Sequence, residues 1–325
     1  LAAYARKKLD KLDRYLPNIA DIRVDLSQQR SRRGEAVSRG GGGVKPRAQA
    51  NLSLAAMAVL MASAFTVSMG FGVVLPLLPF LIERLLGGGA EAGQISRATG
   101  LLTGLYMLSL FLFAPMWGRL SDRYGRRVVL LIGLIGFGAT MLVFAFVESL
   151  VAVYAERVLS GLFAAAVTPV ALAAVGDLAA TEEARARRLT FVSLAGISGF
   201  LLGPMLGVFI ARAGADMVAT ADPMASLTFP LAATAVLAFA IAGAAVVALP
   251  RTRRQGWLAS PDPTVSPTSR WLIPNLLILG FIVAAGVGVF EVGLALRGKQ
   301  ELGMTPTQIA LMFTECSLVM LVVKA

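Results

Sequence analysis

Eight long apolar stretches constrain this chain more than any other feature of its sequence. They cover residues 53–82, 98–117, 128–147, 150–176, 189–211, 227–249, 272–296 and 306–325. Each of the first seven is long enough to cross a bilayer as a helix, which takes roughly 20 apolar residues. Their apolar character is continuous, whereas the strands of a membrane barrel would alternate over about 10 residues. The sequence therefore predicts an all-α, multi-pass integral protein of the cell membrane.

The composition excludes several classes of function. Hydrophobic residues make up 57% of the chain and charged residues 15%, which is too little polar surface for a soluble globule. The chain has no histidine, and its one cysteine, Cys316, lies within the last apolar stretch. The commonest catalytic base and metal ligand is thus missing, and no disulfide framework can form. We expect no enzyme activity, no metal and no cofactor.

The basic residues predict the orientation in the membrane. Arginines gather in the connections 118–127, 185–188 and 251–270, and the alternate connections carry fewer basic residues. Positive charge marks the cytoplasmic side of membrane proteins. The arginine-rich connections and the N-terminus are therefore expected in the cytoplasm.

The first 50 residues differ from the rest. They hold twelve Lys and Arg and five Asp and Glu, a net charge of +7, and they end in a glycine-rich linker. One expected helix and one expected strand cannot form a core. The segment KKLDKLDRYLPNIADIRVDL resembles a fragment of the ribosome hibernation-promoting factor family. Two interpretations stay open: a basic arm near anionic lipid or RNA, and a fusion or gene-calling artefact.

The segment GRLSDRYGRR lies between the second and third apolar stretches. It contains glycines, one acid and several arginines: Gly118, Asp122, Arg123, Gly125, Arg126 and Arg127. Glycine at each end of a short turn would let two antiparallel helices approach, and Asp122 can pair with an arginine or accept helix amides. The segment resembles the loop signature of the major facilitator superfamily. A cytoplasmic anchor alone is the alternative interpretation, and it would need only the arginines.

Asp177 ends the fourth apolar stretch on the same predicted side. The resemblance implies that an acid at this place pairs with the loop arginines, so we expect a contact between Asp177 and Arg126 or Arg123. Such a contact could form and break as an inner gate closes and opens. A solvated carboxylate at a helix end is the alternative.

Two further segments resemble the same family. GFGVVLPLLP contains Gly70, Gly72, Pro76 and Pro79 and is similar to its proline-broken first helix. GFLLGPMLG contains Gly199, Gly203, Pro204 and Gly207 and is similar to the signature of its proton antiporters, although Val208 replaces the final glycine. These glycines share one helix face with room for close packing, and Pro204 can bend the helix. The resemblance implies that this face abuts the opposite half of the protein; ordinary helix packing is the alternative.

Charged residues within apolar stretches are costly and often functional. Arg157 resembles the arginine of the family's fourth helix, and we expect it to point at a central cavity, where it could hold an anion or act on a proton-carrying carboxylate. Its neighbour Glu156 is not expected to pair with it, because adjacent residues on a helix do not face each other, and could extend outward. Glu291 and Glu315 are the other embedded acids, and burial could raise the pKa of each toward the range needed to carry protons. Glu315 is expected to lie deeper and is the better candidate, whereas Glu291 lies near the outer end of its stretch, where simple exposure is the alternative.

Together these features predict the organisation of the chain. Residues 1–50 form the arm, 51–249 a complete six-helix half, 250–270 a cytoplasmic connector, and 271–325 about two helices of a truncated second half. The resemblance implies a proton-coupled exporter of small apolar or drug-like compounds, with a small molecule, protons and the bilayer as partners and no specific nucleic acid. A metabolite symporter or uniporter of the same fold, and a membrane-tethered ribosome-binding factor, are the alternatives.

Overall fold

The computed structural model describes residues 53–87, 89–178, 181–218, 225–250, 267–305 and 307–315. The predicted N-terminal arm, most of the predicted connector and Cys316 lie outside these ranges. None of the described residues lies in a strand. The helical class predicted from the apolar stretches is confirmed.

The first apolar stretch forms three consecutive elements: α3 (Leu54–Val74), the 3-10 turn η1 (Leu75–Leu77) and α4 (Leu78–Leu86). Pro76 and Pro79 interrupt the α-helix here, as the sequence predicts, because proline cannot donate a backbone hydrogen bond. The helices that follow are α5 (Ala92–Tyr124), α6 (Arg126–Phe144), α7 (Leu150–Ala164), α8 (Thr168–Leu178), α9 (Glu182–Val218), α10 (Ala225–Ala248) and α11 (Pro267–Gln300).

Six helical segments in the described part of the chain are long and apolar enough to cross a membrane. They are Leu54–Leu86, Ala92–Tyr124, Arg126–Phe144, Leu150–Asp177, Glu182–Gly214 and Thr228–Ala248. They correspond to the first six predicted stretches. The seventh stretch lies within α11, and part of the eighth is helical over residues 307–315.

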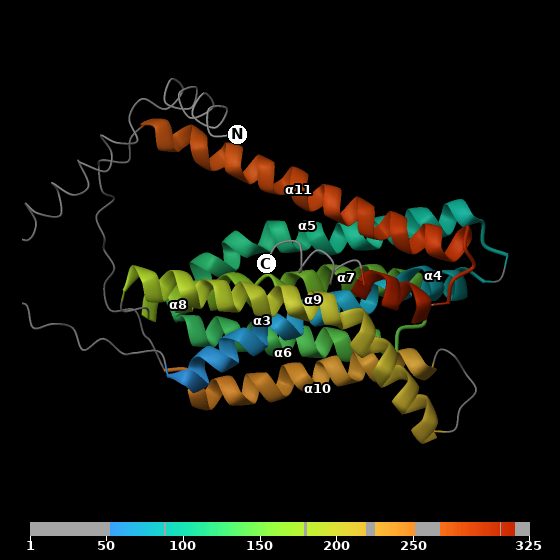
Figure 1. Ribbon diagram of the computed structural model, residues 1–325, viewed down its shortest axis with the longest axis horizontal. Coiled ribbons are helices and arrows are strands. Elements are labelled where there is room, and N and C mark those ends of the chain that lie inside the picture. The colour runs from blue at the N-terminus through green and yellow to red at the C-terminus, as the bar shows by residue number, and fades with distance from the viewer. Residues whose placement is uncertain are drawn as a thin grey trace, which may run out of the picture. The chain divides into compact units, whose positions relative to one another are not determined.

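The six segments pack into one bundle with an apolar core. α3 packs against α9 and α10, α5 against α7, and α6 against α7 and α10 (Figure 1). Leu60, Leu130 and Phe137 are completely or almost completely buried in the core. Other large apolar side chains remain on the outside, such as Phe209 at 71% exposure and Val151 at 79%. An apolar exterior of this kind is suited to lipid rather than water.

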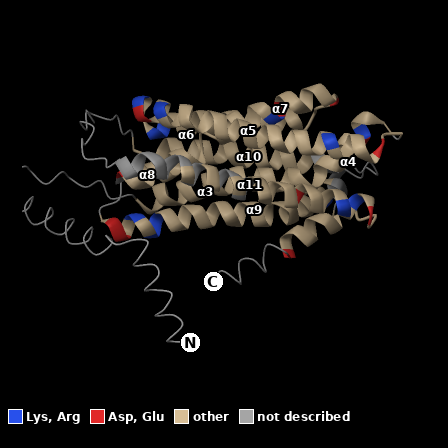
Figure 2. Ribbon diagram, turned by 90° about the horizontal axis from the view of Figure 1, so that it is seen from above, with Lys and Arg blue, Asp and Glu red and all other residues tan. Residues whose placement is uncertain are grey.

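Charged residues gather toward the two ends of the bundle and leave a largely uncharged band between them (Figure 2). We call the end that carries Asp122, Arg126 and Asp177 the inner end, following the orientation predicted from the arginines. The end that carries Gly87 and Ser149 is called the outer end. α11 approaches α5 near its own C-terminal end and diverges from it toward Pro267 (Figure 1).

Candidate functional site

The turn at the inner end between α5 and α6 consists of one residue, Gly125. Its φ of 97° and ψ of 148° belong to a region that only glycine adopts easily. The expectation of a glycine at each end of the turn was wrong for Gly118, which lies inside α5. A side chain at Gly118 would meet nothing within 4 Å. The apolar run had suggested an earlier end for this helix, whereas α5 continues to Tyr124, next to the glycine that breaks it.

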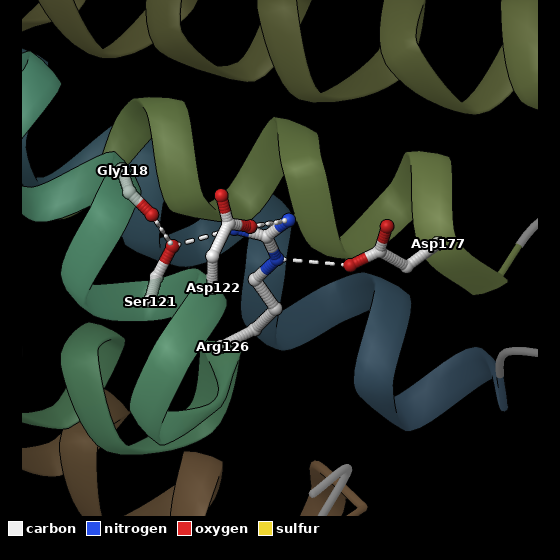
Figure 3. A network of polar contacts seen from close by, with 5 residues as sticks. All are labelled: Gly118, Ser121, Asp122, Arg126 and Asp177. Carbon is white, nitrogen blue, oxygen red and sulfur yellow. Dashed lines mark hydrogen bonds and ion pairs between the residues drawn. The ribbon is translucent and has the colours of Figure 1, made fainter. Parts of the chain in front are cut away.

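Arg126 joins three helices at the inner end (Figure 3). Its guanidinium contacts Asp122 on α5 with Nη2 to Oδ1 at 2.7 Å and Asp177 on α8 with Nε to Oδ2 at 2.9 Å. Its Nη1 donates to the hydroxyl of Ser121 at 2.5 Å, and that hydroxyl donates to the carbonyl of Gly118 at 2.8 Å. The predicted contact between Asp177 and a loop arginine is present, and Arg126 makes it.

The two carboxylates of this cluster are partly open to solvent. The side chain of Asp177 is 56% exposed and that of Asp122 is 47% exposed, whereas that of Arg126 is 18% exposed. Ion pairs of this exposure contribute about 0–1 kcal/mol each. The cluster is therefore weak enough to break and re-form during a conformational change.

The other two arginines of the segment have different contacts. Arg123, the alternative partner for Asp177, makes no ion pair among the described residues and lies 5.5 Å from the ring centre of Tyr124. Arg127 donates to the carbonyl of Leu249 at 3.1 Å and to that of Val246. These carbonyls end α10, so Arg127 satisfies a helix C-terminus. The segment therefore contacts α10 through Arg127 as well as α8 through Arg126.

Glu156 and Arg157 form a buried ion pair within α7, with Arg157 Nε 2.6 Å from Glu156 Oε2. Each side chain is 2% exposed. The expectations that adjacent residues would not pair and that Glu156 could extend outward were both wrong. The rule for neighbouring positions applies to side chains that extend from a helix surface into water. Inside the bundle, an unpaired charge costs far more than folding the arginine back along its own helix.

Two aromatic rings lie beside the guanidinium of Arg157, and two polar atoms of the pair have no hydrogen-bond partner among the described residues. The guanidinium of Arg157 lies 4.4 Å from the ring centre of Phe144 and 5.7 Å from that of Tyr106. Glu156 Oε1 and Arg157 Nη2 are buried without a hydrogen-bond partner among the described residues. The pair thus keeps one acceptor and one donor available in a region from which water is excluded.

The two acids of the second half have the reverse of the expected burial. Glu291 is 6% exposed, whereas Glu315, expected to lie deeper, is exposed. Glu291 is one helical turn from the fully buried Ala295, and both face the packed side of α11. Position along an apolar stretch indicates depth in the membrane, but it does not indicate which side of the helix is covered.

The glycine face of α9 packs against α3. A Cβ at Gly199 would lie 2.2 Å from the carbonyl oxygen of Phe65, and one at Gly203 would lie 2.7 Å from that of Met69. A Cβ at Gly207 would lie 3.2 Å from a methyl of Val73. The expectation that this face abuts the opposite half was therefore wrong, because it belongs to a tight contact within the first half.

Pro204 lies within α9, which continues as an α-helix through it. Because proline has no backbone N–H, the carbonyl of Phe200 loses its helical partner. That carbonyl faces Gly72 on α3, where a Cβ would approach it to 2.6 Å. Gly72 on α3 and Pro204 on α9 therefore belong to the same contact between these two helices.

A contact between the two halves at the outer end was not predicted from the sequence. Lys299 on α11 lies 2.6 Å from a carboxylate oxygen of Glu83 on α4 and donates to the carbonyl of Pro79 at 2.7 Å. Gln300 donates to the carbonyl of Ala92 at 3.1 Å and to the hydroxyl of Ser96 at 3.2 Å. More than 200 residues separate the partners, so no local pattern could reveal them. The one available signal was a basic residue at the outer end of a membrane helix.

Comparison with known proteins supports a transporter fold. Residues 60–325 match the family model described as Major Facilitator Superfamily. Multidrug resistance protein 2 of Bacillus subtilis (strain 168) is 25% identical over 267 residues, which cover 82% of this chain and 64% of that protein. Quinolone resistance protein NorA of Staphylococcus aureus (strain MRSA252) is 26% identical over 259 residues, which cover 79% and 62%. The chain thus spans less than two thirds of the length of these curated relatives.

Solved structures share the arrangement of helices. The crystal structure of the human organic anion transporter MFSD10 (TETRAN) superposes with a TM-score of 0.59 at 23% identity, covering 81% of this chain and 69% of that chain. The crystal structure of D-xylose-proton symporter gives a TM-score of 0.54 at 15% identity, covering 81% and 66%. At these identities the likeness concerns the fold alone.

Proposed function

Because the chain belongs to the Major Facilitator Superfamily, we propose that it is part of a secondary transporter that exports small apolar or drug-like compounds in exchange for protons. Two relatives named for drug and quinolone resistance, which align with about four fifths of the chain, support the substrate class. The apolar core of the described helices, in which Glu156 and Arg157 form one fully buried ion pair, supports the same class, because a strongly charged solute would need more partners there.

The observation that carries the proposal is the buried Glu156–Arg157 pair. A carboxyl group can bind and release a proton, whereas a guanidinium keeps its charge. We assign proton binding to Glu156, with Arg157 as the fixed charge beside it that favours release. The unpartnered Oε1 atom is where the proton would bind.

The inner cluster around Arg126 supplies an element with two states. Its ion pairs connect α5, α6 and α8, and each is exposed enough to be broken at small cost. We assign Asp122, Arg126 and Asp177 to the inner gate. Gly125 and Arg127 place the turn and fix it to α10, and Arg123 is a positive surface charge.

The experiment is a drug-accumulation assay in cells that express the full-length gene. Expression is expected to lower the accumulation of a quinolone and of a fluorescent apolar dye, and a protonophore should abolish the difference. The Glu156→Gln variant, checked for membrane insertion, should behave as non-expressing cells do. Lower accumulation that persists with the protonophore would remove proton coupling. A difference confined to an anionic metabolite would favour the symporter or uniporter instead.

A further inference from the structure

A cavity of about 520 Å³ lies at the outer end of the bundle, inside the first half of the protein. It is enclosed by α4, by the end of α6 with the residues that follow it, and by the start of α10. The described residues that line it lie between Val74 and Leu231 in the sequence. The cavity is therefore separate from the contact that α11 makes with α4 and α5.

The cavity is suited to water. Arg84 on α4 and Glu148, in the connection after α6, line it and are both exposed. The hydroxyl of Thr228 on α10 also lines it and donates to the carbonyl of Ala145 at 3.3 Å. Ionisable residues of a membrane protein usually face water or a water-filled space. A cavity of this size with these polar groups has room for on the order of ten waters.

Phe144 belongs both to the wall of this cavity and to the surroundings of the buried ion pair. It is the last residue of α6, it lines the cavity, and it is 4% exposed. The centre of its ring lies 4.4 Å from the guanidinium carbon of Arg157. Glu156 lies only about 9 Å along α7 from the outer start of that helix, at 1.5 Å per residue. One aromatic residue thus borders both the outer cavity and the pair.

The groups that face Glu156 do not by themselves provide a path for a proton. Its neighbour Arg157 keeps its proton, and the hydroxyl of Ser160 donates to the carbonyl of Arg157 at 3.3 Å. Tyr106 faces the guanidinium from α5, with its ring centre 5.7 Å away. Oε1 of Glu156 has no hydrogen-bond partner among the described residues. A carboxylate receives a proton through a direct hydrogen bond or through a water, so a relay to Oε1 needs water.

We infer that this cavity is the outer proton entry to Glu156, and that the ring of Phe144 closes it. The inference rests on the proposed function, because it supplies the protons that Glu156 is assigned to bind. With the ring turned away from Arg157, water from the cavity reaches Oε1; with the ring over the guanidinium, the route is closed. Protons then enter through the first half rather than between the halves. Phe144 is a positioning residue, because it controls the access of water and binds no proton itself.

The first test measures how fast a reagent from outside reaches Glu156. Intact cells that express the full-length protein are treated at mildly acidic pH with a carbodiimide that carries a quaternary ammonium and does not cross the bilayer. With glycine ethyl ester present, a carboxyl that reacts becomes an amide, and mass spectrometry of the purified protein locates it. Phe144→Ala is expected to speed the labelling of Glu156 roughly three- to tenfold, because no ring covers the guanidinium. Equal rates in this variant and the parent would overturn the inference.

Phe137→Ala is the matched control. Phe137 lies about two turns before Phe144 on the same face of α6. It is completely buried and is not among the residues that line the cavity. This variant loosens the core by the loss of the same ring and should label at the parent rate. Labelling as fast as in Phe144→Ala would show that loosened packing, rather than an opened route, exposes Glu156.

A second test asks whether the reagent passes through the cavity. Thr228→Phe narrows the cavity from α10, and Ala145→Phe narrows it from the end of α6 if the first variant inserts poorly. Combined with Phe144→Ala, either should return labelling toward the parent rate. Ala152→Phe, on the exposed start of α7 and not among the lining residues, should leave labelling fast. Fast labelling with the cavity narrowed would place the entry elsewhere and overturn the route.

These measurements need neither a drug nor a pH gradient, so they can fail independently of the proposed function. Fast labelling in Phe144→Ala that is reversed by narrowing the cavity, in a protein that exports no drug, would support the route and contradict the proposed function. Proton-coupled drug export with equal labelling in all variants would support the function and overturn the route.

Discussion

Glu156 and Arg157 are two charged residues buried among apolar helices. In the Glu156–Arg157 pair, each partner makes the burial of the other tolerable. The sequence identified both residues as unusual but not their pairing. Helix periodicity gives the direction in which a side chain leaves the helix. The conformation that a long side chain then adopts depends on the surrounding helices.

Removing one partner of this pair should destabilise the protein unequally. Glu156→Gln leaves a guanidinium that cannot lose its charge, whereas Arg157→Gln leaves a carboxyl that can bind a proton. We expect Glu156→Gln to cost about 3–5 kcal/mol, Arg157→Gln clearly less, and the double variant less than the sum of the two. Thermal unfolding of the purified protein would measure this, and equal, additive losses would contradict the pairing.

Gly125 and Gly118 allow a comparison within one segment. Gly125→Ala forces a side chain into a backbone region that costs about 1–3 kcal/mol for other residues. Gly118→Ala is helical with open space around it and should be neutral or stabilising by up to about 1 kcal/mol. Thermal unfolding of the two variants should rank them in this order; the reverse order would show that the turn is formed differently.

Among the helices, the sequence predicted which ones exist better than it predicted where each begins and ends or which neighbours each contacts. Apolar length identified the six spans because crossing a bilayer demands it. It underestimated α5, whose first turn begins with a capping box at Glu91 and Gln94 and whose last turn ends at Gly125. Both ends lie beyond the apolar part of the helix, where capping residues rather than hydropathy determine at which residue the helix begins or ends.

The glycine face of α9 is a second case in which the sequence predicted a feature but not its details. Its spacing correctly indicated a close helix contact, but α3 is the partner rather than the opposite half. Nothing in a single helix specifies which neighbour will fill its groove. The pairing of Gly72 with Pro204 becomes visible only when the helices are placed. The contact of Asp177 with a loop arginine was expected from the family resemblance, and the structure identifies Arg126 as that arginine.

The inner cluster should affect transport through Arg126 and not through Arg123. Arg126→Ala removes contacts to α5 and α8, and Arg126→Lys should restore function only in part, because a lysine lacks the fork that reaches both Asp122 and Asp177. Arg123→Ala should change transport little. Drug export normalised to inserted protein would measure this, and full activity of Arg126→Ala would contradict the gate.

Across the whole molecule, the polar contacts between the two halves in the described ranges lie at the outer end, through Lys299 and Gln300. The Arg126 cluster at the inner end joins helices of the first half. The described part of the chain therefore combines an outer contact between halves with an inner cluster inside one half. A transporter that alternates access needs control at both ends.

The proposed exchange of a drug-like compound for protons through the Glu156–Arg157 pair can be measured with the full-length protein, reconstituted in vesicles that carry an imposed pH gradient. We expect a quinolone to accumulate on the acidic side, this movement to stop when the gradient is collapsed, and Glu156→Gln vesicles to show no accumulation. Quinolone movement at the same rate with and without the gradient, or unchanged in Glu156→Gln, would contradict it.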